Sequence, residues 1–245
     1  MIKPLLVALQ LLTRLPVKIN TPINDRTMGQ SLLYYPVAGS LIGIFLAIIL
    51  LSLHPHTSSL ILAGLLLAFW VMITGALHLD GLADSADAWL GGFADPQRTL
   101  DIMKDPRCGP AAVIILVIVL LLKLAALEYI VRQQQWQAII IACVFSRTML
   151  LPLFLTTNYV RQNGLGSVLA NHLPRGPAWT VTLSVLIVLT VLSGMQTLVV
   201  ISVAIATWAF LRHMMISRIA GMTGDTAGAT VEIMELVILL GACFW

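Results

Sequence analysis

Apolar runs of about 20 residues recur along this chain of 245 residues, and they constrain its fold more than any other feature. A helix of about 20 apolar residues is long enough to cross a hydrocarbon core of ~30 Å. Hydrophobic residues make up 59% of the chain and charged residues only 10%, which excludes a soluble globular protein. The sequence therefore predicts an all-α, polytopic membrane protein, with one membrane-embedded domain over residues 1–245.

The predicted spans divide the Lys and Arg residues unequally between the two sides of the membrane. If the amino terminus is cytoplasmic, eleven of these residues fall on the cytoplasmic side and Arg132 alone falls outside. This imbalance is the positive-inside pattern. We expect seven spans, at roughly 33–53, 58–79, 110–130, 137–157, 178–194, 196–211 and 228–245.

A run of carboxylates follows the second predicted span, in the segment His78-Leu79-Asp80-Gly81-Leu82-Ala83-Asp84-Ser85-Ala86-Asp87. On a helix, this spacing puts the three Asp side chains within roughly 60° of arc on one face. Like charges so close destabilise the helix unless a cation lies between them, and a hard divalent ion is the natural partner. We predict a Mg²⁺ site that Mn²⁺ could also fill; the alternative is a solvated acidic helix end.

A stretch that mixes both signs of charge lies further along the same cytoplasmic loop. Arg98, Lys104 and Arg107 alternate there with Asp101 and Asp105. Arg binds phosphate oxygens with two donors at once, and Lys supplies a compact positive charge. Beside a metal-binding acidic helix, these cations favour a polyphosphate substrate; the alternative is an ordinary basic loop on the cytoplasmic side.

The second polar cluster opens the last predicted span, in Gly221-Met222-Thr223-Gly224-Asp225-Thr226-Ala227-Gly228-Ala229. Thr223 and Asp225 are natural helix caps, and the glycines let backbone N–H groups approach a ligand closely. A helix amino terminus at the cytoplasmic face favours phosphate. The alternative is a plain capped loop.

Several charges fall inside the apolar spans. Each such residue costs roughly 2.5–3.5 kcal/mol on insertion scales, so it is expected to be paired or functional. This applies to Arg147, Glu232 and Glu235, whereas we expect Lys123 and Glu128 to extend toward the outer side.

Together these residues resemble the cobalamin synthase family. The resemblance rests on the acidic run, Gly91-Gly92, Arg98, Met103-Lys104-Asp105-Pro106-Arg107 and Thr223-Gly224-Asp225-Thr226-Ala227-Gly228-Ala229. It extends to Thr13-Arg14-Leu15-Pro16, Tyr35-Pro36-Val37-Ala38-Gly39 and Arg161 before Gly164-Leu165-Gly166. The chain departs from the family at Pro110-Ala111-Ala112, where relatives often carry a further glycine.

The resemblance implies a late reaction of cobalamin (vitamin B12) biosynthesis, in which α-ribazole or its 5′-phosphate attacks adenosylcobinamide-GDP and releases GMP. It also implies a bacterial inner membrane, no nucleic acid partner, and an active site facing the cytoplasm; it leaves a homo-oligomer open. Which carboxylates bind metal and which group is the base also stay open. We expect catalytic Asp84, Asp87 and Lys104, substrate- and phosphate-binding Arg98, Lys104, Arg107, Arg147, Thr223 and Gly224, and metal ligands Asp80, Asp84, Asp87, Asp105 and Asp225.

Two other functions would use similar residues. A CDP-alcohol phosphotransferase performs the same displacement, but its Asp-Gly-x-x-Ala-Arg pattern has Asp84-Ser85 in place of Ala-Arg here. The same pattern continues with a Gly before two further Asp residues. Asp101 and Asp105 could be those residues, but the position that should be Gly is Gln97. A transporter would use the charges within the spans, but the charges gather at one face and no broken helices are expected.

Overall fold

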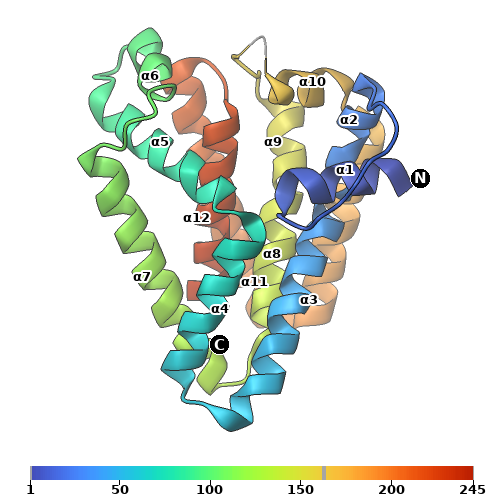
Figure 1. Ribbon diagram of the computed structural model, residues 1–245, viewed down its shortest axis with the longest axis vertical. Helices are drawn as coiled ribbons and strands as arrows, with labels where there is room; N and C mark the ends of the chain where they lie inside the picture. Colours follow the sequence, from blue (N-terminus) through green and yellow to red (C-terminus); the bar gives the residue numbers. More distant parts are fainter. Residues whose placement is uncertain (1, 162–163, 245) are drawn as a thin grey trace.

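Helices make up almost all of the regular structure in residues 2–161 and 164–244, which the computed structural model describes. Figure 1 shows α3, α4, α7, α8 and α12 running lengthwise, with α2, α6 and α10 gathered at one end of the bundle. We call this the α6 end. The helices are α1 (Ile2–Leu12), α2 (Asp25–Ser31), α3 (Tyr35–Leu53), α4 (Ser59–Thr74), α5 (Leu77–Gly91), α6 (Pro96–Ile102), α7 (Pro110–Arg132), α8 (Trp136–Thr148), α9 (Leu150–Thr156), α10 (Leu165–His172), α11 (Arg175–Ile219) and α12 (Gly224–Ala242).

Several of these helices are long and apolar enough to cross a membrane, as the composition predicts. Four qualify by length and hydropathy, at Asp25–Leu53, Pro110–Arg132, Trp136–Thr156 and Thr197–Ile219. Two sharply bent helix pairs raise the number to six if each pair counts as one span. The all-α membrane fold is therefore confirmed, while the exact number of spans, expected to be seven, stays a prediction.

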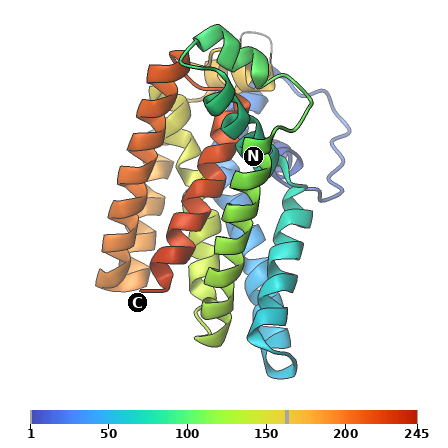
Figure 2. The same cartoon turned by 90° about the vertical axis from the view of Figure 1, so that its left-hand side faces the viewer.

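The long helix α11 consists of two arms, Arg175–Val191 and Thr197–Ile219. The Arg175 guanidinium donates to the Leu155 carbonyl over 3.1 Å, and the Arg212 guanidinium donates to the Thr156 hydroxyl over 2.9 Å. Both arginines thus meet the same end of α9, whereas a straight helix would separate them by about 55 Å. The arms therefore run in opposite directions, and Figure 2 shows them lengthwise in the bundle. This agrees with the prediction of two segments here.

A sharp break separates α4 from α5. Gly75 and Ala76 both adopt the left-handed conformation, with φ of 63° and 57°, and the two helices meet at 88°. A side chain at Gly75 would collide with the Arg14 side chain, so glycine meets both the backbone and the packing requirement. The predicted span 58–79 was wrong in ending beyond this point, and so was the expectation of no broken helix. The break turns the acidic segment away from the axis of α4.

Close contact between α5 and α12 fixes the position of the acidic helix. A Cβ atom at Gly81 would lie 2.6 Å from the Asp225 carbonyl oxygen, and one at Gly228 would lie 3.3 Å from the Cα of His78. Because neither helix carries a side chain at its point of contact, the two backbones approach each other directly. The amino-terminal turn of α12 therefore lies against the acidic helix.

Four buried charges connect α7, α8 and α12 inside the bundle. The Lys123 ammonium lies 2.5 Å from a carboxylate oxygen of Glu232 and 2.5 Å from one of Glu235, and it lies over the Trp70 ring. Glu235 also accepts from the Arg147 guanidinium. The prediction that the acidic residues of the last span are paired is confirmed. The expectation that Lys123 extends outward was wrong, because its ammonium is buried among partners.

Candidate active site

The acidic run lies on α5 at the α6 end of the bundle, so the predicted helix is confirmed. Asp80 is exposed, while Asp84 and Asp87 are half-buried. The pKa of Asp84 is raised to about 6, first by its partial burial and then by the negative charges of Asp80 and Asp225. These carboxylates therefore act on one another electrostatically, as the helical spacing predicts.

The first turn of α12 brings Asp225 to this group. Its carboxylate lies 2.7 Å from the Arg161 guanidinium, and both side chains are mostly buried. Burial raises the pKa of Asp225, Arg161 opposes that shift, and Asp80 adds to it. Asp225 thus joins two sets of charges, the carboxylates of α5 and the cation of the segment before α10.

Hydrogen bonds hold the amino terminus of α12 in place. The Thr223 side chain accepts from the Thr226 N–H while the Thr226 side chain accepts from the Thr223 N–H, which is a complete capping box. Met222 pairs with the 158–160 segment, donating to the Asn158 carbonyl over 2.8 Å and accepting from the Val160 N–H over 3.0 Å. The predicted cap at Thr223 is confirmed, and Gly224 beside it is exposed.

Asp87 has a different set of partners. Its two carboxylate oxygens accept hydrogen bonds from the backbone N–H groups of Gly109 and Ala112, over 2.6 and 2.9 Å. These N–H groups belong to the start of α7, which a carboxylate stabilises. Asp87 therefore connects the acidic helix to α7, a structural role that the sequence pattern did not indicate.

The basic stretch lies on the loop between α6 and α7. Asp105 and Arg107 form an exposed ion pair, with the closest atoms 2.5 Å apart, and Arg107 holds the pKa of Asp105 at about 2. Arg98 lies over the Phe93 ring, and Lys104 is exposed. The two predicted roles of Asp105 and Arg107, metal ligand and phosphate contact, would compete with their pairing.

The loop nevertheless reaches the carboxylate cluster through Met103, the residue before Lys104. The Arg161 guanidinium lies 3.5 Å from the Met103 carbonyl, and the Thr223 hydroxyl lies 3.7 Å from the Met103 sulfur. The two predicted clusters therefore meet here, although Met103 and Thr223 are 120 positions apart in the sequence. Lys104 is the basic residue of the loop next to the contact.

Arg147 does not join the site. Its side chain is fully buried in α8, where it pairs with Glu235 and donates to the Ser146 hydroxyl over 2.9 Å. The expectation that Arg147 binds substrate phosphate is not supported, because its charge is already neutralised within the bundle. The sequence signal was real, since a charge inside a span must be paired or functional, but the pairing accounts for it.

Two residues of the site were missing from the expected set. Arg161 supplies the cation nearest to Asp225, and Tyr159 lies beside Gly224, where an added Cβ atom would be 3.6 Å from the Tyr159 hydroxyl oxygen. In the sequence, Arg161 counted only as one of the cytoplasmic charges and as part of the family pattern. Its pairing depends on a contact between the segment before α10 and α12, which no local spacing reveals.

The oxygen donors of this cluster suit Mg²⁺ or Mn²⁺, and the surplus of negative charge favours a cation. Within residues 2–161 and 164–244, however, no three His, Cys, Asp or Glu side chains are grouped closely enough to hold a metal. Asp80, Asp84 and Asp225 are the best-placed candidates because their charges already interact. Asp87 and Asp105 are engaged elsewhere.

Known proteins resemble this chain over almost its entire length, although no solved structure matches it. An adenosylcobinamide-GDP ribazoletransferase of Pseudomonas fluorescens (strain Pf0-1) is 51% identical, over 97% of this chain and 98% of its own. One from Stutzerimonas stutzeri (strain A1501) is 51% identical, over 97% and 96%. The model of the cobalamin-5-phosphate synthase family matches residues 4–243. The chain therefore belongs to the cobalamin-5-phosphate synthase family.

Proposed function

We propose that this protein joins adenosylcobinamide-GDP to α-ribazole or α-ribazole 5′-phosphate, giving adenosylcobalamin or its 5′-phosphate and GMP. The family match and the relatives named adenosylcobinamide-GDP ribazoletransferase support this activity. The family match also outweighs the CDP-alcohol phosphotransferase and transporter alternatives. The protein is a transferase of cobalamin synthesis, and the assignment of its chemistry to particular residues is our proposal.

The reaction is a displacement at phosphorus. A ribazole hydroxyl oxygen forms a bond to the phosphorus that carries cobinamide, and the bond from that phosphorus to the bridging oxygen breaks. GMP leaves with the bridging oxygen and its electron pair, while a carboxylate of the site receives the hydroxyl proton. Such a displacement needs neutralisation of the charge that grows on the departing phosphate.

One observation carries the proposal: carboxylates from α5 and α12 and the Arg161 cation converge at the α6 end. A bound Mg²⁺ would supply the charge that a pyrophosphate requires, and Asp80, Asp84 and Asp225 would hold it. Arg161 holds the Asp225 carboxylate in place through their ion pair. Lys104 is free to bind phosphate oxygens, since its side chain is exposed.

We also propose that the α6 end faces the cytoplasm of a bacterial inner membrane. Eleven of the fourteen Lys and Arg residues fall on this side if the amino terminus is cytoplasmic. Both substrates are strongly polar, and adenosylcobinamide-GDP carries a charged pyrophosphate, so an active site on the side where they are made spares them a crossing of the bilayer. A homo-oligomer remains compatible with this arrangement.

The direct test is GMP release by the purified protein in phospholipid vesicles. Adenosylcobinamide-GDP with α-ribazole should give equal amounts of GMP and corrinoid product, whereas a CDP-alcohol with the same acceptor should give no CMP. Asp84→Asn should abolish GMP release, and Asp101→Asn, on the exposed surface of α6, should preserve it. GMP release without α-ribazole, or none from the wild type, would contradict the proposed reaction.

A further inference from the structure

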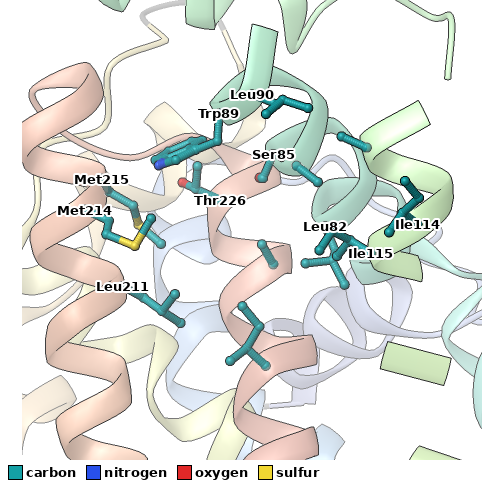
Figure 3. A pocket seen from close by; sticks show the side chains of 14 residues that line it. Leu82, Ser85, Trp89, Leu90, Ile114, Ile115, Leu211, Met214, Met215 and Thr226 are labelled. Carbon is teal, nitrogen blue, oxygen red and sulfur yellow. The ribbon is translucent and has the colours of Figure 1, made fainter. Parts of the chain in front are cut away.

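An apolar cavity of about 580 Å³ lies beneath α5, between α7, the second arm of α11 and α12. Figure 3 shows the side chains from these helices that surround it, including Trp89, Met214 and Ile114. Its volume falls within the usual range of ligand pockets, ~300–1,000 Å³. Almost all of its lining is apolar, so its occupant must have an apolar body.

The cavity faces away from the carboxylate cluster. The α5 residues that line it include Leu82, Ser85 and Trp89, and at 100° per residue they lie roughly opposite the face that carries Asp80 and Asp84. A substrate bound in the cavity would therefore be separated from the carboxylates by the body of α5. The occupant is thus a different molecule from the reactants, and the inference does not depend on the reaction.

Two buried polar atoms next to the cavity have no hydrogen-bond partner within the described part of the chain. One is the Ser85 hydroxyl oxygen, on a side chain that lines the cavity and is 91% buried (9% exposed). The other is the Nε atom of Arg218. Buried polar atoms usually have a partner. These two atoms therefore indicate a ligand that offers hydrogen-bond acceptors at the polar end of an apolar body.

Arg218 marks that polar end. Residues 211, 214, 215 and 218 follow one another on a single face of α11, and the first three line the cavity. A smaller cavity of about 330 Å³ continues from there, lined by Arg218 and sharing Trp89 and Met214 with the larger one. The Arg218 guanidinium also lies over the Trp89 ring. Along this face of α11 the lining of the two cavities therefore changes from apolar side chains to the Arg218 guanidinium.

The dimensions and surroundings fit an acyl chain. On α12 the lining extends from Thr226 to Ile233, a length of about 10 Å at 1.5 Å per residue. One leaflet of a ~30 Å hydrocarbon core is roughly 15 Å thick, so an acyl chain is long enough to fill the cavity. The apolar lining also continues onto the outside of the bundle. Leu90 and Ile114 line the cavity yet are 69% and 58% exposed. The cavity is therefore open to the apolar phase that surrounds the helices.

We propose that this cavity binds one anionic phospholipid, with an acyl chain between α7 and α11 and the phosphate at Arg218. The Ser85 hydroxyl donates to an ester oxygen, one helical turn below Trp89. The Trp89 ring and the Met214 thioether pack on the upper part of the chain. The bound lipid fills the space beneath α5 and so supports the helix that carries the carboxylates.

The test uses quenching of Trp89 fluorescence by brominated acyl chains. Wild-type protein and Trp89→Phe are placed in phosphatidylcholine vesicles that contain brominated phosphatidylglycerol or brominated phosphatidylcholine, and the Trp89 signal is taken by difference. Brominated phosphatidylglycerol should quench Trp89 at a several-fold lower fraction of the lipid. Equal quenching by the two lipids would overturn the anionic preference, and no quenching would overturn occupancy of the cavity.

Matched variants separate the headgroup from the chain. Arg218→Gln should remove the preference for phosphatidylglycerol, whereas Arg218→Lys and Arg26→Gln, an exposed arginine of α2, should retain it. Ala111→Leu narrows the cavity and should weaken quenching by both lipids. Excess inorganic phosphate should leave the preference unchanged. If phosphate abolishes it, or if Arg218→Gln preserves it, the lipid headgroup is not the ligand of Arg218.

Discussion

The Arg161 guanidinium and the Asp225 carboxylate lie 2.7 Å apart and join two segments that are distant in the sequence. Asp225 opens α12, and Arg161 follows the short segment that pairs with Met222. The pair thereby fixes the position of a carboxylate directly against the acidic helix. Loss of this ion pair should therefore lower the activity by displacing the Asp225 carboxylate.

We predict that Arg161→Gln lowers kcat by up to about 10²–10³-fold, the loss typical of removing one oxyanion-hole donor. Arg161→Lys should recover part of kcat because it keeps the charge. The combined Arg161→Gln and Asp225→Asn variant should be no worse than the poorer single variant, since both changes disrupt one unit. Steady-state kinetics of GMP release measures this. Fully additive losses would show that the two residues act separately.

Asp80→Asn and Asp84→Asn should each abolish turnover. Membrane insertion and the unfolding temperature should stay as in the wild type. Each change removes one carboxylate from the group that would hold Mg²⁺. Neither change alters a predicted membrane span. Activity should require Mg²⁺ or Mn²⁺ and disappear in excess EDTA. Asp101→Asn is the control, because Asp101 contacts Gln97 on the exposed side of α6. Full turnover in EDTA would defeat the metal proposal.

Lys104→Ala should reduce kcat as well as affinity, because a phosphate contact becomes stronger as charge moves onto the departing GMP. Arg107→Ala should have a smaller effect than Lys104→Ala, since Asp105 already neutralises Arg107. Rapid-quench and steady-state measurements would separate the two parameters. Near-normal kcat in both variants would mean that the loop does not bind the pyrophosphate.

Asp87→Ala should destabilise the protein by about 1–3 kcal/mol, because two backbone N–H groups at the start of α7 lose their acceptor. Asp87→Asn keeps one acceptor oxygen and should cost less. Thermal unfolding of the protein in detergent provides the measurement. A loss of activity in Asp87→Asn at unchanged stability would instead assign the carboxylate to the reaction.

Cys108 offers a native reporter of orientation, because it is exposed on the loop between α6 and α7. An impermeant thiol reagent should leave Cys108 unlabelled in intact cells and label it once the membrane is opened. Cysteines introduced at 158–161 and 212–219 should behave in the same way, and one near His56 should react from outside. Labelling of Cys108 in intact cells would place the carboxylates on the wrong side for their substrates.

The acidic helix and the cap at Thr223 could be predicted because both depend on residues a few positions apart. The spacing of Asp80, Asp84 and Asp87 and the capping preference of Thr223 act within one or two helical turns. The pairing of Arg161 with Asp225 could not, because it depends on how α12 packs beside another segment. The same holds for Lys123. Its position in a span suggested that the side chain extends toward the outer side of the membrane, and only the fold shows that it pairs with Glu232 and Glu235.

The break between α4 and α5 could not be predicted either, for a different reason. Residues 58–79 are apolar enough to read as one span, and the sequence does not distinguish Gly75 from Gly64, which lies within α4. The helix ends at the left-handed backbone of Gly75 and Ala76, and the Arg14 side chain leaves no room for a side chain at Gly75. Hydropathy measures the preference for lipid and carries no information about the backbone conformation of a single residue.

The buried charges of α7, α8 and α12 have a consequence for the order in which the chain matures. Lys123 and Arg147 are synthesised about a hundred residues before Glu232 and Glu235, their only acidic partners in the described structure. Until α12 emerges from the ribosome, two cations in the apolar bundle lack counter-charges. The helix α12 is made after α7 and α8, and it therefore supplies the counter-charges that complete this buried cluster.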